Sequence, residues 1–249
     1  MQPALFITDL DNTFVGDDAA LATLQRQLRQ WQSQGGTRVV YSTGRSRLLY
    51  EELKQEKGLM EPDALVTAVG TEIYCDAQDQ PDRQWSEQIQ GHWDLAKVKA
   101  WVSKLPSLQP QPASEQRPFK ASYFVTDPAT AEAVIEQLGR DLAQDGVEAN
   151  IIYSDSRDLD ILPKRANKGA AMAFLQAKWG IEPAATVACG DSGNDQAFFS
   201  DDRAKGIIVG NAKPELLQWH QAHPSNWRYL AQAHYAGGIL EGLQHFGFA

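Results

Sequence analysis

The chain has 249 residues, 43% hydrophobic and 22% charged, which is typical of a globular protein with one large domain or two modest ones. Its net charge of −9 argues against a nucleic-acid or anionic-membrane surface, and no apolar run is long enough to span a bilayer. Two cysteines are too few for a disulfide framework, so we expect a protein of the reducing cytoplasm.

The first 70 residues alternate between short apolar runs and segments of helical periodicity. Strands are expected at 4–8, 37–42 and 65–69, with helices at about 21–31 and 47–57 between them. An alternation of strands and helices implies right-handed crossovers, and therefore a parallel sheet.

The same alternation returns late in the chain. Helical patterns cover about 167–178 and 195–199, strand patterns cover 186–189 and 206–209, and another helix begins near Pro214. We therefore predict an α/β fold whose core is a Rossmann-like, doubly wound parallel sheet.

The middle of the chain breaks this pattern. Its expected elements are a helix, a proline-rich loop, a strand, a second helix and two strands, at 93–104, 106–118, 119–125, 129–144, 147–153 and 159–162. Such an α+β stretch inside a doubly wound pattern is typical of an inserted domain. We predict a discontinuous core of residues 1–81 and 165–249 and an inserted α+β cap domain of residues 82–164.

Chemistry-bearing residues stand where the predicted strands end, which is where open parallel sheets bind ligands. The first strand ends in the D-x-D pair of Asp9 and Asp11, whose two charges need a cation or hydrogen bonds in a tight site. The pair is compatible with a nucleophile at Asp9 and a general acid/base at Asp11, and equally with a solvated turn.

Two further motifs are ambiguous when each is taken alone. Thr43 and Gly44 follow the second strand at a helix start, which favours either an anion cradle or an ordinary N-cap. Lys168 opens a later helix, where it could neutralise phosphoryl oxygens or be a solvated surface charge.

The run CGDSGND is more specific, because it places two acids and an amide within five residues at a strand end. Asp191 and Asp195, with Asp9 and the backbone carbonyl of Asp11, would supply the oxygen ligands that magnesium (Mg²⁺) prefers. A capped helix start is the alternative interpretation of this run.

In this order, D-x-D-x-T, T-G, a lysine and G-D-x-x-N-D resemble the motifs of the haloacid dehalogenase superfamily. The resemblance implies that Asp9 is the nucleophile and Asp11 the general acid/base. The other implied roles are phosphate binding by Thr43, Gly44 and Lys168, and Mg²⁺ binding by Asp9, Asp11, Asp191 and Asp195 with support from Asn194. An acid at position 11 is typical of the phosphatases of this superfamily, whereas its dehalogenases lack it.

Longer stretches of sequence narrow the resemblance to one family within this superfamily. DLDNTFVGD, YSTGRS, LVTAVGTEIY, NKGAAMAFL, VACGDSGNDQAFF and GIIVGNAKPELLQW are similar to cyanobacterial and plant sucrose-phosphate phosphatases. This implies hydrolysis of sucrose 6-phosphate through an aspartyl-phosphate, as the last step of sucrose synthesis, with sucrose-phosphate synthase as a possible partner. The alternatives are a capped phosphatase for mannosyl-3-phosphoglycerate or trehalose 6-phosphate, and an inactive sugar-phosphate-binding domain, which the intact acidic motifs disfavour.

Substrate specificity is expected in the cap and in the loops that face it, because a closing cap excludes water and contacts the leaving group. A disaccharide requires convergent hydrogen-bonding side chains. The candidates are Arg45, Glu72, Lys120, Tyr123, Arg157 and Asp158. Arg45 is also compatible with a pairing to a surface acid, and each of the others with a solvated polar position on a half-exposed sheet.

Overall fold

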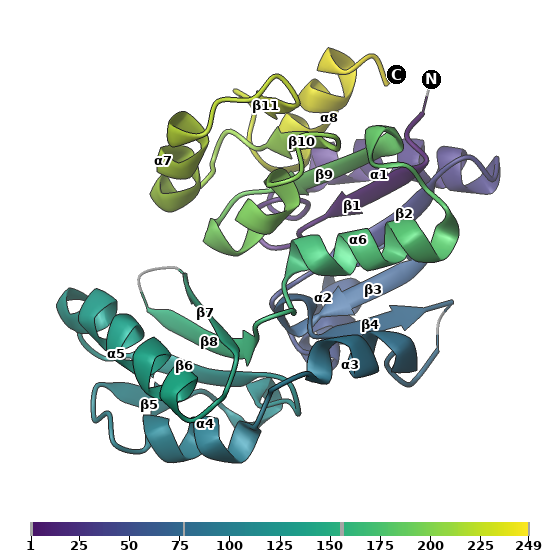
Figure 1. Cartoon of the computed structure of the whole chain (residues 1–249). Coiled ribbons are helices and arrows are strands. Elements are labelled where there is room, and N and C mark those ends of the chain that lie inside the picture. The colour runs from purple at the N-terminus through teal and green to yellow at the C-terminus, as the bar shows by residue number, and fades with distance from the viewer. Residues whose placement is uncertain (1, 77, 155–156, 249) are drawn as a thin grey trace.

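Two β-sheets organise the chain, and a computed structural model describes residues 2–76, 78–154 and 157–248 (Figure 1). Within these ranges the larger sheet has seven strands, in the order β11 (Arg228–Leu230), β10 (Lys205–Ile208), β9 (Thr186–Gly190), β1 (Leu5–Thr8), β2 (Arg38–Ser42), β3 (Ala64–Thr67) and β4 (Glu72–Cys75). Each of these strands runs parallel to its neighbours, except that β4 is antiparallel to β3. The predicted Rossmann-like, doubly wound α/β core is therefore confirmed.

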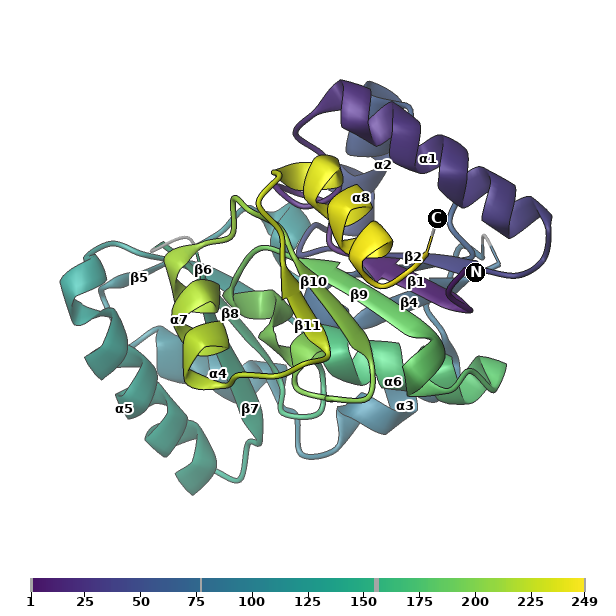
Figure 2. The same ribbon diagram turned by 90° about the horizontal axis from the view of Figure 1, so that it is seen from above.

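Helices cover both faces of this sheet (Figure 2). On one face lie α1 (Asp18–Ser33), α2 (Arg47–Lys57) and α8 (Tyr235–His245). On the other lie α3 (Arg83–Gln90), α6 (Lys168–Trp179), α7 (Pro214–Ala222) and the 3₁₀ segment η5 (Gly193–Phe199). Two shorter 3₁₀ segments, η1 (Ala68–Gly70) and η4 (Pro183–Ala185), complete the core.

The sequence accounts for this layering. Strand β1 is LFIT and fully buried, with Phe6 packed toward one helical layer and Ile7 toward the other, as expected of a parallel strand covered on both faces. Helix α1 begins because the Asp17 side chain accepts hydrogen bonds from two backbone amides of the first turn. Its buried residues recur at helical spacing: Leu21, Leu24, Leu28 and Trp31.

The smaller sheet is antiparallel and lies in the middle of the chain. In the part of the chain that the structure describes it has four strands, in the order β5 (Leu108–Pro110), β6 (Ala121–Val125), β8 (Asp158–Pro163) and β7 (Ala149–Ser154). Helices α4 (Leu95–Val102) and α5 (Ala131–Gln144) pack on one face, and the 3₁₀ segments η2 (Ala113–Glu115) and η3 (Pro128–Thr130) lie in connections (Figure 1).

Strand alternation in the smaller sheet separates an apolar face from a polar one. Tyr123 and Leu159 point toward the helices and are buried with them. Ser122 and Asp160 alternate with these residues, so they occupy the opposite face. That polar face is turned toward the carboxyl ends of the strands in the larger sheet, where the cavity described below lies.

Helix α3 marks the transition between the two parts of the chain. Trp85 and Ile89 are buried in the core cluster, and the indole Nε1 of Trp85 donates to the carbonyl of Gly70 at 3.1 Å. By contrast, Trp93 packs against the apolar cluster of the smaller sheet. We therefore propose Gly91 as the boundary, rather than residue 82, and use "insert" below for residues 92–164 and "core" for the rest.

The predicted helices and strands otherwise lie close to the described ones, with five omissions and one change of type. Strands β4, β5 and β11 and helices α3 and α8 were not predicted, and the expected helix at 195–199 is the 3₁₀ segment η5. Short edge strands carry too little periodicity to be recognised from sequence. Within residues 2–76, 78–154 and 157–248, no helix is both long and apolar enough to cross a membrane.

Candidate active site

Three of the predicted motifs follow three neighbouring parallel strands, at the carboxyl ends of these strands in the larger sheet. Asp9 follows β1 and Asp191 follows β9, and the two strands pair in register up to Thr8 and Cys189. The Asp9 amide continues this pairing by donating to the carbonyl of Cys189 at 3.0 Å. Thr43 follows β2 on the other side of β1. The ends of adjacent parallel strands thus bring residues from distant parts of the sequence together.

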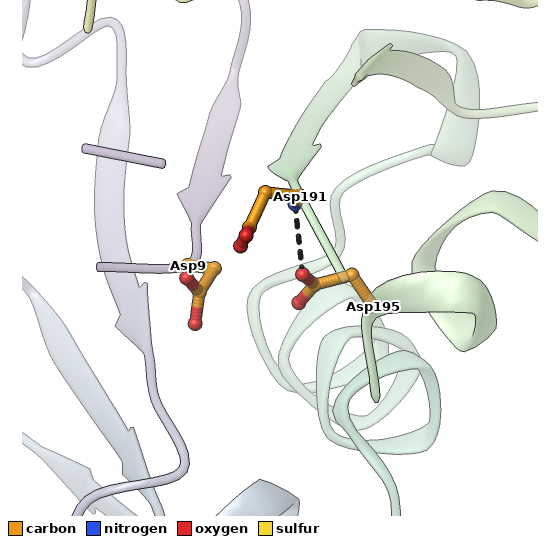
Figure 3. A group of neighbouring side chains, drawn as sticks. All are labelled: Asp9, Asp191 and Asp195. Carbon is orange, nitrogen blue, oxygen red and sulfur yellow. Dashed lines mark hydrogen bonds between the residues drawn. The ribbon is translucent and has the colours of Figure 1, made fainter. Parts of the chain in front are cut away.

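Asp9, Asp191 and Asp195 form a buried carboxylate cluster (Figure 3). One oxygen from each lies within 4.8 Å of the others. The Oδ2 of Asp195 accepts from the amides of Asp191 and Ser192 at 3.0 and 3.1 Å, which is one half of a capping box at the start of η5. The hydroxyl of Thr13 donates to Asp191 at 3.0 Å.

Lys168 lies at the centre of this cluster and is fully buried. Its Nζ donates to Asp9 at 2.6 Å and to Asp195 at 2.7 Å. Burial alone would lower the pKa of Lys168, but the adjacent carboxylates of Asp195 and Asp9 outweigh it and raise the pKa above its ordinary value. The structure therefore places a positively charged lysine inside this cluster rather than on the surface.

The cluster has a deficit of positive charge. Burial raises the pKa of Asp9 to about 7, although Lys168 opposes this, and burial together with Asp9 and Asp195 raises the pKa of Asp191 to about 8. Among the described residues of the cluster, one ammonium faces three carboxylates. Buried oxygen ligands with uncompensated negative charge are the donor set that hard divalent cations select, so the cluster could hold a metal ion.

Asp11 lies apart from the cluster, nearer the solvent. Arg45 binds it through two hydrogen bonds, from Nε at 2.8 Å and from Nη2 at 2.7 Å. This bidentate contact raises the pKa of Arg45. Arg45 was expected to contact substrate or a surface acid, and in this structure its partner is the predicted general acid/base.

The residues after β2 form a short loop of Thr43, Gly44 and Arg45, which we call the phosphate loop after the role that the sequence predicts for it. Thr43 is buried, and its hydroxyl oxygen accepts from the backbone amide of Arg45 at 3.1 Å. Gly44 and Arg45 line the adjoining cavity. The backbone and side-chain polar groups of this loop are compatible with the predicted anion cradle, which stays a prediction.

A cavity of about 370 Å³ joins the carboxylate cluster to the polar face of the insert. The core contributes Asp9, Asp11, Asn12, Gly44, Arg45, Leu49, Asp191, Ser192 and Asn194. The insert contributes Gln111, Glu115, Lys120, Ser154, Asp158 and Asp160. Both parts of the chain therefore build one site, with the carboxylates of Asp9, Asp11 and Asp191 at its core end and mixed polar groups, Lys120 among them, at its insert end.

Of the substrate candidates, Arg45, Lys120 and Asp158 line this cavity, whereas three others do not. Glu72 is buried behind it and accepts hydrogen bonds from Thr67 and Tyr74. Tyr123 points into the apolar core of the insert. Arg157 lies over the ring of Phe124, with its Cζ 4.2 Å from the ring centroid.

Among the charged and amide side chains on the insert side of the cavity, sequence reasoning missed Gln111, Glu115 and Asp160. The signal for Asp160 was present, because Asp158 stands directly before the strand predicted at 159–162. An extended backbone places Asp160, two residues further on, on the same face. Glu115 and Gln111 lie in or beside the proline-rich loop, whose path the sequence does not determine. Local periodicity therefore could have found one of the three.

The fold and the ordered acidic motifs define a haloacid dehalogenase-like hydrolase. Solved structures of haloacid dehalogenase-like hydrolases from Bacillus subtilis share the fold at TM-scores of 0.71 and 0.67, with 20% and 16% sequence identity. Within this superfamily, the chain belongs to the sucrose-6F-phosphate phosphohydrolase family, whose model matches residues 2–247.

Individual relatives agree with this family. The X-ray structure of the sucrose-phosphatase from Synechocystis in complex with sucrose and phosphate is 42% identical, with a TM-score of 0.91 over 99% of both chains. "Probable sucrose-phosphatase 2" from Arabidopsis thaliana is 40% identical over 97% of this chain, and the chain spans 59% of its length. "Mannosylfructose-phosphate phosphatase" from Agrobacterium fabrum is 35% identical over 98% of this chain and 96% of its own length.

Proposed function

We propose that this protein is a Mg²⁺-dependent phosphatase that hydrolyses sucrose 6-phosphate to sucrose and phosphate. The observation that carries the proposal is the continuous cavity between the Asp9–Lys168 contact and the polar face of the insert. A phosphoryl group at the carboxylate end leaves room for a sugar at the other end. The likeness to a sucrose-phosphatase solved with sucrose and phosphate supports the same substrate.

In the proposed reaction, the Asp9 carboxylate attacks phosphorus and the ester P–O bond breaks, which leaves an aspartyl-phosphate. Asp11 gives its proton to the leaving sugar oxygen and then takes a proton from the water that hydrolyses the aspartyl-phosphate. Lys168 neutralises phosphoryl oxygens beside Asp9, and Thr43 and Gly44 donate hydrogen bonds to them. Arg45 orients the Asp11 carboxylate through its two hydrogen bonds.

The carboxylate cluster fits a magnesium ion by its donor chemistry, since it offers three buried oxygens and an excess of negative charge. Asp9 and Asp191 are the proposed direct ligands, with the backbone carbonyl of Asp11 and with Asn194 in support. Asp195 already uses both oxygens, for Lys168 and for backbone amides, so we propose that it mainly positions its neighbours. A bound ion would neutralise charge on the transferring phosphoryl group.

The insert side of the cavity suits a polyhydroxylated leaving group. Its carboxylates and amides accept hydrogen bonds from sugar hydroxyls, and Lys120 and Gln111 can donate to them. The Oε1 of Glu115 is buried without a hydrogen-bond partner among the described residues, so it is free to accept one. A cytoplasmic location, supported by two buried free cysteines, and docking of sucrose-phosphate synthase are further proposals.

A mannosylfructose phosphate is the second candidate substrate, because the Agrobacterium relative matches this chain over nearly its whole length. Sucrose and mannosylfructose phosphates would present different sugars to the insert while using the same core chemistry. The trehalose 6-phosphate and mannosyl-3-phosphoglycerate hypotheses belong in the same comparison.

A substrate panel tests the proposal. We expect kcat/KM for sucrose 6-phosphate to exceed that for the other three sugar phosphates by at least about tenfold, since hydrogen-bonded sugar sites discriminate strongly. A chelator should abolish turnover, and added Mg²⁺ should restore it. Preference for another sugar phosphate would contradict the substrate, and full activity in excess EDTA would contradict the metal dependence.

A further inference from the structure

The insert contacts the core at a second place, behind the cavity. Arg117 lies in the insert between η2 and β6, and its Nε donates to Oε1 of Glu72 on β4 at 2.7 Å. The Glu72 side chain is only 5% exposed, whereas that of Arg117 is 34% exposed. A buried carboxylate is costly unless it is paired, so Glu72 favours the position of the insert in which Arg117 reaches it.

Glu72 is held rigidly by the core before Arg117 reaches it. Its Oε2 accepts from the Thr67 hydroxyl at 3.1 Å and from the Tyr74 hydroxyl at 2.9 Å. These two bonds fix the plane of the carboxylate and leave Oε1 for the guanidinium. The core therefore holds the Glu72 carboxylate in position to accept a hydrogen bond. Arg117, the donor, belongs to the insert and moves with it.

Thr67 leads directly into a strained segment. Ala68 and Val69 have φ angles of 51° and 59°, in the left-handed region that a β-branched residue such as Val69 rarely adopts. Gly70 follows with φ 94°, and a Cβ there would lie 2.5 Å from the backbone of Asn167. Such a backbone persists only where its surroundings hold it firmly.

This segment supports the phosphate loop, and the insert completes the support. The Val69 amide donates to the carbonyl of Thr43 at 3.1 Å, and the Ala68 amide donates to that of Arg45 at 2.9 Å. The remaining carbonyl, of Gly44, accepts from the Nζ of the buried insert residue Lys120 at 3.2 Å. The insert is thus attached through Lys120 to the loop that is proposed to hold the phosphoryl group, and through Arg117 to Glu72, which follows the supporting segment two residues after Gly70.

From these contacts we infer that Arg117 and Glu72 are a positioning pair, which docks the insert at a fixed distance from the phosphate loop. The inference rests on the proposed function, since the distance matters only if one substrate spans both ends of the cavity. A sugar phosphate needs the polar face of the insert and the phosphoryl site at the same time. A small aryl phosphate needs only the phosphoryl site.

The first experiment compares sucrose 6-phosphate with p-nitrophenyl phosphate. We expect Arg117→Met and Glu72→Gln to lower kcat/KM for sucrose 6-phosphate about tenfold or more and to change that for p-nitrophenyl phosphate less than about twofold. Arg117→Lys should recover part of the loss, and the double variant should be no worse than either single one. The matched control is Arg140→Ala, an exposed insert arginine paired with Glu136.

Equal losses on both substrates with a lowered melting temperature, or no loss on either, would overturn the pairing role.

A second measurement needs no turnover. Spin labels at Glu132→Cys on α5 and Arg26→Cys on α1 report the distance between insert and core, because both positions are exposed and both native cysteines are buried. With Mg²⁺ and inorganic phosphate, we expect one narrow distance distribution that Arg117→Met broadens.

An unchanged distribution in Arg117→Met would also refute the inference. The two proposals can fail separately. If the wild-type protein does not hydrolyse sucrose 6-phosphate, the proposed function fails, while the spin-label distances still test the positioning pair. If hydrolysis occurs and the distances do not respond, only the positioning pair fails.

Discussion

The two sheets carry their charged residues in different ways. In the larger sheet the acids are buried at or just beyond strand ends, and Asp9 and Asp195 share Lys168 as a common cation. In the smaller sheet the acids alternate along strand faces and stay partly accessible beside Lys120. The first arrangement suits the proposed reaction centre, and the second suits a surface that would bind a sugar through hydrogen bonds. Substitutions in the two places should therefore have separable effects on chemistry and on substrate choice.

The largest effect is expected from Asp9→Asn. The amide cannot act as a nucleophile, so kcat should fall by at least about 1,000-fold for both sucrose 6-phosphate and p-nitrophenyl phosphate. Steady-state phosphate release measures the loss, and Asp18→Asn, an exposed change on α1, is the control. Substantial turnover by a folded Asp9→Asn protein would rule out Asp9 as the nucleophile.

Lys168→Met should come next. It removes the ammonium that contacts both Asp9 and Asp195, while the volume of the buried side chain is nearly kept. We expect kcat to fall by about 100- to 1,000-fold for both substrates, because charge stabilisation at the phosphoryl group is lost. Lys205→Met on β10 is the control. A loss confined to the sugar phosphate would contradict the placement of Lys168 in the reaction centre.

Glu115→Gln tests the insert, on the side of the cavity that is proposed to bind the sugar. The change keeps the shape of the side chain but removes a charged acceptor from the insert side of the cavity. KM for sucrose 6-phosphate should rise by about tenfold, with p-nitrophenyl phosphate unaffected. The matched control is Glu136→Gln on α5, away from the cavity. If both substrates responded equally, the separation between the two sheets would be wrong.

The smallest effect is a pH dependence of stability. Without metal, the raised pKa values of Asp9 and Asp191, about 7 and about 8, mean that the folded chain binds more protons than the unfolded chain above about pH 4. Stability should therefore fall as pH rises from about 4 toward 8, and the melting temperature should fall with it. Added Mg²⁺ should offset this fall, and Asp191→Asn should weaken it. Thermal scans in EDTA and in Mg²⁺ measure the fall in melting temperature and its reversal by the metal. A melting temperature that rises over this pH range in EDTA would contradict the raised pKa values of Asp9 and Asp191.

The core could be predicted from sequence because its signals are local. Buried parallel strands are continuous apolar runs, and their ends are marked by the motifs that carry Asp9, Thr43 and Asp191. The order of those motifs then indicated one site, and the structure brings them to one edge. The reaction roles themselves stay predictions until they are measured.

The insert could not be predicted to the same depth, because its useful signals depend on which face of a strand is buried. Tyr123 is a residue type that often contacts sugars, yet the register of β6 points its side chain toward α4 and α5. Glu72 has the same ambiguity, since only the antiparallel pairing of β4 with β3 places it beside Thr67. Tertiary packing determines which face of a strand is buried, and the local sequence pattern of a single chain does not determine it.

The neighbouring position of β1 and β9 has a consequence for synthesis of the chain. Lys168 and Asp9 are 159 residues apart, and Thr13 and Asp191 are 178 apart, with the insert between them. The insert consists of local contacts and can fold as it leaves the ribosome, whereas β1 must wait for β9 before it gains its second neighbour. A nascent chain is therefore expected to acquire its sugar-facing surface early and its phosphatase centre only near the end of translation.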